Sequence, residues 1–493
     1  MAPRLLTALG AGSLTALAAC SSPDLSGATF SCSTSADCLD SEVCLLEAET
    51  PACVPAADHP IKIGMSGPLQ GPSADLGNEM RRGISVMFAA QNAAGGVHGR
   101  PLELVTQNDS YDPTAAVQAM HTLLDIRETT PNPDAPDVRG PNGVFALLGN
   151  IGTPTMLETA PLATKNQVVF FAPFTGAQQY LRDGTNSPYV YNYRAGYFEE
   201  AQAMIDYLAT SRTPRVISEP PGDSYRRVIV FQQDDSYGDS GYEGIRNAYN
   251  RISPLPSSDA IRRIRYQRDR VESVDEPVAE AKALLTELLE EAGGGPISVA
   301  FVMIDTYRPG NKFIRALKDW MHTDAELAQN LDVVFMHVSF VGSDSLSDEL
   351  RAPPETHVDA TSASGGRKSY TEDVMVMQVV PYYGSQAPAV TDYRRHLAEY
   401  EGGEETFTSL EGYIVARLFV RALELTGRDL DTERFRGVLD TQIRDLDIGI
   451  GPLLSFTPEN RQASHTVWGS SLEADGTFSV PFIWDPGSRI RPN

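Results

Sequence analysis

The sequence predicts an α/β protein of two lobes, each built around a parallel β-sheet with helices packed against it. Short apolar segments alternate along the chain with longer segments of helical period. Strands that alternate in this way with helices of about 10–15 residues form parallel sheets. The alternation occurs in two series, one starting at residue 61 and the other at residue 227. The length of 493 residues agrees with two or more lobes, at roughly 100–200 residues per domain.

The first series has four predicted strands, over residues 61–65, 102–107, 144–148 and 167–171. A helix is expected over residues 75–92, where four apolar side chains recur at helical spacing: Met80, Ile84, Met87 and Phe88. A second helix is expected from Pro113 to about Ile126. Asp112 is its predicted N-cap, and Pro113 suits the first helical position.

The second series has predicted strands over residues 227–231 and 297–304, and helices over 241–249, 278–291 and 311–321. Residues 190–193 are a further candidate strand, at a crossing between the lobes. Three stretches rich in Pro, Asp, Ser and Gly are predicted to be exposed insertions: 129–142, 213–224 and 345–367.

The first twenty residues are predicted to be a secretory signal rather than part of the fold. Arg4 precedes an apolar stretch over residues 5–18, which ends in small residues at Ala19-Cys20. The stretch is shorter than the ~20 apolar residues that a membrane span needs. Residues 17–20 also resemble a bacterial lipobox, in which Cys20 carries lipid and anchors the protein to a membrane. An ordinary cleaved signal with a chance cysteine is the alternative.

The other four cysteines are crowded into one short segment: Cys32, Cys38, Cys44 and Cys53. In an exported protein an even, clustered set predicts two disulfides, for which three pairings exist. A zinc knuckle is the rival, but the spacing lacks a CxxC pair. We interpret the segment as a small stapled spacer.

Charge and motifs argue against several functions. Forty basic residues against sixty-five acidic ones give a net charge of −25, which disfavours nucleic-acid partners. Scattered histidines without an HxH or HExxH pair give no support for a metal, and no motif for a cofactor occurs. The best adjacent carboxylate pair is Asp234-Asp235, but sequence neighbours at a strand end usually point in different directions. We therefore expect no catalytic residues and no enzyme activity.

The loops that follow the predicted strands carry hydroxyl groups, aromatic rings and glycines. Ligands of open α/β sheets bind beyond the carboxyl ends of the strands, so these loops are the candidate site. In the loop after residue 148, Thr153 is the predicted N-cap of the next helix and Pro154 its first residue. The amides of Thr155 and Met156 would then face outward, unpaired, and favour an anion such as a carboxylate. A plain N-cap is the alternative.

Six stretches in a fixed order resemble a known family. They are IKIGMSGPLQG from Ile61, NAAGGVHGR from Asn92, GNIGTPT from Gly149, DSYG from Asp235, VSFVGS from Val338 and SLEGYIVAR from Ser409. Together they resemble the leucine/isoleucine/valine-type substrate-binding proteins of bacterial ABC transporters, in lipoprotein form. The resemblance runs from about Ile61 to the end of the chain and leaves the cysteine segment uncovered.

The resemblance implies the type I periplasmic-binding fold: α/β, with two Rossmann-like lobes whose parallel central sheets are joined by a multi-strand hinge. The expected divisions are a signal peptide over 1–20 and a Cys-rich tether over 21–58. Lobe 1 is expected over 59–188 and 384–445, and lobe 2 over 189–383 and 446–493.

The resemblance also implies a set of ligand contacts. Lobe 1 is expected to contribute Ser66, Thr153, Thr155 and Thr175, and lobe 2 Tyr197, Tyr237 and Tyr307. In amino-acid binders of this family an acid after the VSFVG-like strand meets the ligand ammonium group. Asp344 is the first acid there, with Asp305 as an alternative; otherwise the ligand is not an α-amino acid.

The function implied is capture of a small polar ligand, an amino acid or a related carboxylate or amide, in a cleft between the lobes. The ligand is then delivered to the permease subunits of an ABC importer. Two alternatives are a ligand-sensing receptor component for a membrane signalling partner and a secreted hydrolase using Asp234 or Asp235. The expected location is the periplasm, with a membrane anchor at Cys20.

Overall fold

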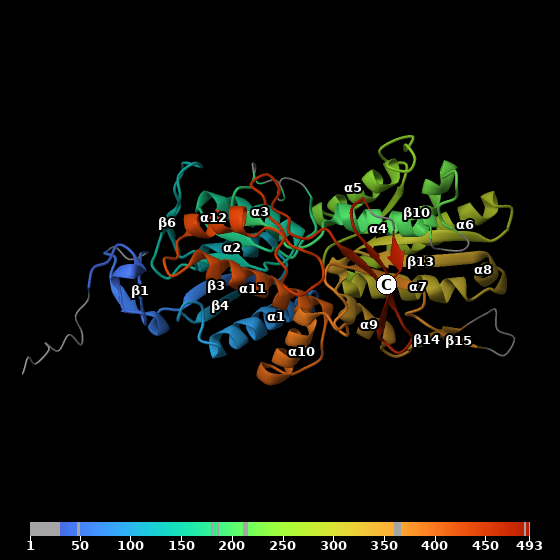
Figure 1. The fold of residues 1–493 in the computed structure, drawn as a ribbon. Coiled ribbons are helices and arrows are strands. Elements are labelled where there is room, and N and C mark those ends of the chain that lie inside the picture. The colour runs from blue at the N-terminus through green and yellow to red at the C-terminus, as the bar shows by residue number, and fades with distance from the viewer. Residues whose placement is uncertain are drawn as a thin grey trace, which may run out of the picture.

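The computed structural model describes residues 30–492 except 47–49, 179–181, 183, 185–186, 211–214, 359–365 and 488–489. The predicted signal segment and Cys20 lie outside the described residues. Among the helices that are described, none has the length and apolar character needed to cross a membrane. Figure 1 shows two α/β bodies side by side, with β1 at one end of the molecule and the β14–β15 hairpin at the other.

The first sheet has five strands in the order β4-β3-β7-β8-β9, and each neighbouring pair is parallel. The strands are β3 (Ile61–Gly67), β4 (Leu102–Asn108), β7 (Ala146–Leu148), β8 (Val169–Phe171) and β9 (Val190–Tyr191). The helices that connect them are α1 (Ala74–Ala93), α2 (Pro113–Leu123) and α3 (Thr153–Lys165). The predicted start of α2 is confirmed, because Asp112 accepts a hydrogen bond from the Ala115 amide at 2.8 Å.

Three helices from much later in the chain complete this body, which we call lobe 1: α10 (Pro388–Tyr400), α11 (Phe407–Thr426) and α12 (Thr432–Gln442). Figure 1 shows α11 beside α1. The two helices approach so closely that a Cβ at Gly83 would lie only 1.8 Å from the Ser409 carbonyl oxygen. Lobe 1 is therefore assembled from two separate parts of the chain.

The second sheet has eight strands in the order β11-β10-β12-β13-β16-β17-β18-β19. They are β10 (Val228–Gln233), β11 (Arg262–Tyr266), β12 (Ile297–Ile304), β13 (Leu331–His337), β16 (Val374–Gln378), β17 (Val467–Leu472), β18 (Phe478–Trp484) and β19 (Arg491–Pro492). The pairs from β11 to β16 are parallel, and those from β16 to β19 are antiparallel. The prediction of two lobes with parallel central sheets is confirmed.

The helices around the second sheet complete the body that we call lobe 2. They are α4 (Tyr197–Thr210), α5 (Ser236–Asn250), α6 (Asp275–Glu291), α7 (Tyr307–Met321), α8 (Ala325–Asn330) and α9 (Ser343–Arg351). All eight residues of β12 are buried, as expected of a central strand covered on both faces. Short 3-10 turns in this lobe are η4 (Gly222–Arg227), η5 (Val271–Val274) and η6 (Ser339–Val341).

The chain crosses between the lobes three times: from β9 to α4, from β16 to α10, and from α12 to β17. Two of the crossing segments pair with each other. The Asn192 amide donates to the Arg461 carbonyl at 2.7 Å, and the Ser464 amide donates to the Tyr193 carbonyl at 2.8 Å. These bonds join two of the three crossing segments side by side at the hinge.

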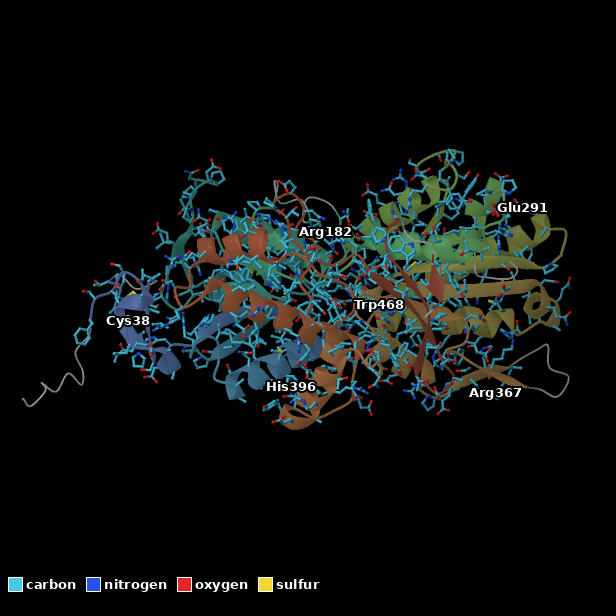
Figure 2. The ribbon with its side chains drawn as sticks, in the orientation of Figure 1. Cys38, Arg182, Glu291, Arg367, His396 and Trp468 are labelled. Carbon is cyan, nitrogen blue, oxygen red and sulfur yellow. A yellow bond between two sulfur atoms is a disulfide. The ribbon has the colours of Figure 1, made fainter. Side chains whose placement is uncertain are left out.

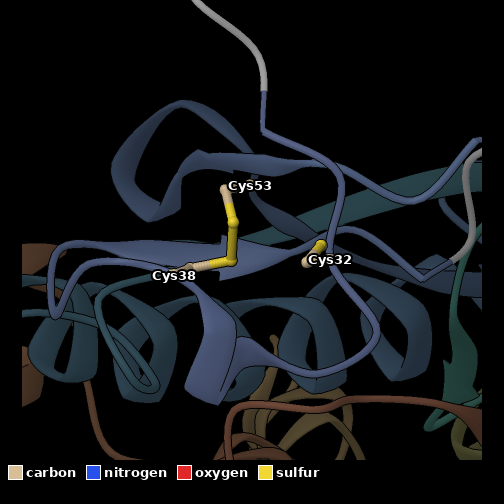
Figure 3. Close-up of side chains that lie close together, drawn as sticks. All are labelled: Cys32, Cys38 and Cys53. Atoms are coloured by element: carbon tan, nitrogen blue, oxygen red, sulfur yellow. A yellow bond between two sulfur atoms is a disulfide. The ribbon is translucent and has the colours of Figure 1, made fainter.

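The four clustered cysteines form two disulfides, Cys32–Cys44 and Cys38–Cys53, which confirms the predicted disulfides and decides their pairing. They staple β1 (Glu42–Cys44) to β2 (Cys53–Pro55), next to η1 (Ser35–Asp37) and η2 (Ala56–Asp58). Figure 3 shows the sulfur–sulfur bond from Cys38 to Cys53, with Cys32 nearby. The zinc alternative is wrong for these residues, because bonded sulfurs are not thiolate ligands.

The stapled segment packs on lobe 1. Arg428, just beyond α11, donates to the Leu39 carbonyl at 2.7 Å, and the Ser35 amide donates to Asp429 at 2.5 Å. The described residues of the segment from Phe30 are thus a folded module attached to lobe 1. Two further hairpins are β5 (Ile126–Glu128) with β6 (Val138–Arg139), and β14 (Thr356–Val358) with β15 (Arg367–Ser369).

Candidate functional site

Polar side chains of lobe 1 gather where neighbouring strands end. Ser66 lies in β3, and its hydroxyl donates to Asp109 Oδ2 at 2.6 Å. Thr153 follows β7 and Thr175 follows β8, and their hydroxyl oxygens are 2.6 Å apart. All of these side chains are buried. Parallel pairing of β3, β7 and β8 brings the ends of the strands to one edge of the sheet.

Aromatic side chains of lobe 2 face this edge. Tyr197 is the first residue of α4, and its ring centroid lies 5.5 Å from that of Tyr237 in the first turn of α5. The Tyr237 ring lies 4.7 Å from Phe340, in the turn after β13. The Tyr237 hydroxyl donates to the Asp305 carbonyl at 2.9 Å, which fixes the ring. Tyr197 and Tyr237 are both fully buried.

Phe340 joins the two lobes. Its ring lies 5.3 Å from Phe174 and 5.9 Å from Tyr111, both of lobe 1. The Tyr197 amide donates to the Gly176 carbonyl at 2.7 Å, and a Cβ at Gly176 would lie 2.3 Å from the Tyr197 ring. Only glycine therefore allows this approach. We call the following set the interlobe cluster: Tyr111, Thr153, Phe174, Thr175, Tyr197, Tyr237 and Phe340.

Two residues, Tyr197 in the cluster and Asn150 next to it, have buried polar groups that lack partners among the described residues. The Tyr197 hydroxyl lies near the Thr153 and Thr175 hydroxyls, but no hydrogen bond of normal geometry joins them. Burial raises the pKa of Tyr197, so its hydroxyl keeps its proton. Asn150 follows β7, and neither polar atom of its side-chain amide, Oδ1 or Nδ2, has a partner among the described residues. Because buried polar groups are nearly always bonded, these unpartnered atoms are candidates for contact with a polar ligand.

The start of α3 differs from the prediction. Gly152, with a φ of 102°, is the N-cap, and the helix begins at Thr153. The Met156 amide is not free, because it donates to the Gly152 carbonyl at 3.1 Å. The Thr155 hydroxyl donates back to the carbonyls of Ile151 and Gly152. The predicted cap at Thr153 is therefore wrong, because a left-handed glycine ends the loop one residue earlier.

Tyr307 and Asp344 lie outside the interlobe cluster. Tyr307 is buried at the start of α7 beside Asp75 of α1; burial, and then the charge of Asp75, raise its pKa. Asp344 lies in the first turn of α9 and accepts a hydrogen bond from the Phe407 amide at 2.8 Å. This bond connects α9 to the first residue of α11 in the opposite lobe, whose N-cap is Thr406. Burial raises the pKa of Asp344 to about 7.

Asp305, the alternative acid, is buried and paired through one carboxylate oxygen, while its Oδ2 has no partner among the described residues. Its Oδ1 is 2.9 Å from His337 Nδ1, one strand away. Burial raises the pKa of Asp305, while the histidine opposes that shift. A third acid, Asp109, accepts the hydrogen bond from Ser66. Burial raises the pKa of Asp109 to about 6, although that hydrogen bond opposes the shift.

A buried ionic network at the hinge has no counterpart in the sequence prediction. Arg194 Nε lies 3.1 Å from Glu411 of α11, and its NH2 group donates to the Ser339 hydroxyl at 2.6 Å. The Ser339 amide donates to Glu200 of α4 at 2.6 Å. Burial raises the pKa of Glu200 to about 7. The residues are far apart in sequence and follow no motif, so only the fold brings them together.

Arg182 is a second residue that the sequence prediction missed. Its guanidinium is buried and donates to the carbonyls of Thr175, Ala177 and Arg194 at 3.0, 2.9 and 2.7 Å. Figure 2 labels it in lobe 1, toward the middle of the molecule. Arg182 thus holds the loop that presents Thr175.

The adjacent acids Asp234 and Asp235 have separate partners. Asp234 lies 3.1 Å from Arg265, whereas Asp235 accepts the Tyr237 amide at 3.0 Å and lies 3.3 Å from Arg268. They form no acid–base pair facing one space, so the hydrolase alternative loses its geometric basis.

Comparisons with known proteins agree with this architecture. A family model described as periplasmic binding protein matches residues 60–253. Leu/Ile/Val-binding protein homolog 2 of Brucella abortus (strain 2308) is 26% identical over 115 residues, which are 23% of this chain and 27% of that protein. The match thus spans only about a quarter of that curated relative, 27% of its length.

Solved structures match over much more of the chain. One from Rhodopirellula baltica SH 1, described as a possible leucine/isoleucine/valine-binding protein, is 30% identical with a TM-score of 0.68 and covers 87% of this chain and 97% of that one. A branched-chain amino acid ABC transporter protein from Thermus thermophilus with bound valine shares the fold at 14% identity and a TM-score of 0.63. That match covers 88% of this chain and 97% of the other.

Proposed function

The chain belongs to the family of periplasmic binding proteins, and on that basis we propose that it captures a small polar ligand between its lobes and delivers it to an ABC importer. Proteins of this family bind their ligands and are not enzymes, as the sequence predicts for this chain. The ligand class is an amino acid or a related carboxylate or amide.

The observation that carries the proposal is the set of unpartnered polar atoms in and next to the interlobe cluster. The Tyr197 hydroxyl and both polar atoms of Asn150 are buried without a partner among the described residues. Leaving such a group unbonded costs about 1–3 kcal/mol, a cost that a bound polar molecule would remove. The Thr153 and Thr175 hydroxyls of lobe 1 lie next to the Tyr197 hydroxyl.

The proposed contacts come from both lobes. Lobe 1 contributes Ser66, Thr153, Thr155 and Thr175, and lobe 2 contributes Tyr197, Tyr237 and Tyr307. Asp344 is proposed to hold the two lobes together in the closed form. Direct bonds across the gap support a closed form, because Ser73 donates to Asp269 at 2.9 Å and Gln233 donates to the Tyr111 hydroxyl at 3.4 Å.

The acids near the gap bear on the choice of ligand. Asp305 Oδ1 is paired with His337 while its buried Oδ2 has no partner among the described residues, and Asp344 is bonded to the Phe407 amide. A ligand screen should therefore contain carboxylates and amides without an α-ammonium group beside the branched-chain amino acids.

Mass spectrometry of small molecules that copurify, followed by a thermal-shift screen, tests the proposal. The panel contains α-amino acids, the matching acids without the amino group, and their amides. We expect one of these to raise the midpoint of thermal unfolding in a concentration-dependent way, because a ligand stabilises only the folded state. A panel without any effect, and no copurifying molecule, would contradict the proposed ligand class.

The variant Thr153→Val tests whether the ligand contacts the Thr153 hydroxyl. It keeps the size of the side chain and removes the hydroxyl, and we expect the affinity to fall about tenfold, or ~1.4 kcal/mol. Thr159→Val is the matched control, because Thr159 lies in the same helix and its hydroxyl is bonded to the Thr155 carbonyl at 2.9 Å. Equal affinity losses in both variants would contradict the assignment of Thr153.

We also propose that Cys20 carries a lipid that anchors the protein to a membrane, as its lipobox-like context implies. When the full chain is expressed in a bacterium, it should partition into the detergent phase, and the variant Cys20→Ala should not. Delivery to an importer is tested in the host, where loss of the gene should abolish uptake of the identified ligand. Unchanged uptake would favour the sensing alternative.

A further inference from the structure

Lobe 2 contains a cavity that the proposed ligand site does not use. The cavity has a volume of about 240 Å³ and lies between α7, β13 and the β14–β15 hairpin. In Figure 2, Arg367 of this hairpin lies at the opposite end of the molecule from Cys38. Two histidines line the cavity, His322 and His357.

The two imidazole rings are adjacent and similarly bonded. Their centroids are 4.4 Å apart. His322 Nδ1 lies 2.9 Å from the Lys318 carbonyl oxygen, and His357 Nδ1 lies 3.2 Å from the Val358 carbonyl oxygen. Because a carbonyl oxygen can only accept, each Nδ1 carries the proton and donates it. The lone pair of each ring is therefore on Nε2.

The Nε2 atoms are the ring nitrogens left over for a ligand. Neither has a hydrogen bond to another described residue, and both histidines line the cavity. A histidine that binds a metal ion typically donates its other ring N–H to a backbone carbonyl or a carboxylate. That arrangement is present here twice, on two elements that face one cavity.

Charged side chains of both signs surround the cavity. Lys318 donates to the Tyr370 carbonyl at 3.0 Å and to the Glu372 carbonyl. Two lysines line the cavity, Lys318 and Lys368, against three acids, Asp332, Glu372 and Asp373.

We propose that His322 and His357 bind a divalent transition-metal ion through their Nε2 atoms, with water completing the coordination. Imidazole nitrogen favours Zn²⁺, Cu²⁺ and Ni²⁺ over Mg²⁺ or Ca²⁺. The ion would connect the end of α7 to the β14–β15 hairpin. This site is separate from the interlobe cluster and does not depend on the proposed function.

Calorimetric titration of the chelator-treated full chain with Zn²⁺ and with Cu²⁺ tests the site. We expect one equivalent to bind, and His322→Gln and His357→Gln each to weaken that binding at least tenfold. His121→Gln, in α2 of lobe 1, is the control for adventitious binding by a surface imidazole and should leave the affinity unchanged. Mg²⁺ should not compete.

Two results would overturn the proposal: no binding by the parent protein, or a loss in His121→Gln equal to that in the other two variants. His357 is buried, so its variant is checked for folding by thermal unfolding without metal. His322 is half-buried, and its variant keeps the test decisive if His357→Gln fails to fold. As a second measurement, the spectrum of bound Cu²⁺ by electron paramagnetic resonance should show two coordinated nitrogens, and one in each variant.

Discussion

Thr153 and Thr155 are two positions apart, yet their hydroxyls have different roles. The Thr153 hydroxyl pairs with Thr175 across two loops, whereas the Thr155 hydroxyl donates to carbonyls of its own loop, including Gly152 at 3.0 Å. Its single proton is thus already used, and only its oxygen remains free to accept a bond. A pattern of residue types cannot distinguish these cases, because the choice depends on the backbone of Gly152.

A selective effect of Thr155→Val follows from this geometry. We expect the variant to weaken binding of ligands that offer an N–H group to Thr155, and to leave the affinity for a carboxylate without such a group nearly unchanged. Parallel titrations with an amide and the matching acid measure the difference. An equal loss for both ligands would show that Thr155 acts through the helix start instead.

A substitution of Tyr237 tests how much its hydroxyl contributes to the stability of the protein. Tyr237→Phe keeps the ring but leaves the buried Asp305 carbonyl without its 2.9 Å bond, so we expect the free energy of unfolding to fall by about 1–3 kcal/mol. Tyr207→Phe is the control, because the Tyr207 ring stacks on Phe482 at 5.1 Å and its contact is aromatic rather than polar. Chemical denaturation of both variants gives the comparison.

At the scale of elements, the disulfide-stapled module shows what spacing alone leaves open. Clustered cysteines predict disulfides, but four cysteines allow three pairings. The fold selects Cys32–Cys44 and Cys38–Cys53, because pairing β1 with β2 places Cys44 opposite Cys53 and leaves each to bond a cysteine from the loop around η1.

Removing one disulfide should affect the module more than the lobes. For the double variant Cys38→Ala/Cys53→Ala we expect the module to lose about 3 kcal/mol of stability, the value for a loop of about 15 residues. Limited proteolysis should then cut within residues 30–58 while the lobes stay intact. Simultaneous cleavage of lobe 1 would show that the module is part of the folding core of that lobe.

One predicted insertion is wrong in part. The composition of residues 345–351 predicts exposure, but they belong to α9, where Leu346 and Leu350 are fully buried. The Ser and Asp residues of the segment dominate its composition and hide the two leucines, which are four positions apart on one helix face. Burial against the rest of lobe 2 overrides the loop-like composition.

At the scale of the whole molecule, Asp344 links the lobes through the N-terminus of α11. Its ordinary carboxyl pKa is 3.8, and burial in the folded protein raises the pKa to about 7. The folded state therefore binds this proton more tightly than the unfolded state. The contribution of Asp344 to stability is complete below its ordinary pKa and is lost as the pH rises through about 7.

Asp344→Asn should remove this pH dependence. We expect the free energy of unfolding of the variant to decline less than that of the parent between about pH 5 and about pH 8. Asp348→Asn is the matched control on the same helix, because Asp348 is exposed and pairs with Arg351 at 2.7 Å. Equal slopes for the parent and Asp344→Asn would contradict the role given to Asp344.

Much of the architecture follows from local sequence. The alternating periods predict the strands β3, β10 and β12 and the helices between them, because a strand or helix must place its apolar residues on the face that it buries. Asp112-Pro113 predicts the start of α2, and the clustered cysteines predict the stapled module. These features depend on residues close together in the chain.

Tertiary structure alone decided how the site is assembled. It placed Phe340 between Phe174 and Tyr237, bonded Asp344 to the Phe407 amide, and joined Arg194, Glu411 and Glu200 at the hinge. The physical reason is that each of these contacts joins residues from separate segments, and such distances depend on how the two lobes close. The sequence by itself determined which side chains stand at the strand ends, but not which of them meet.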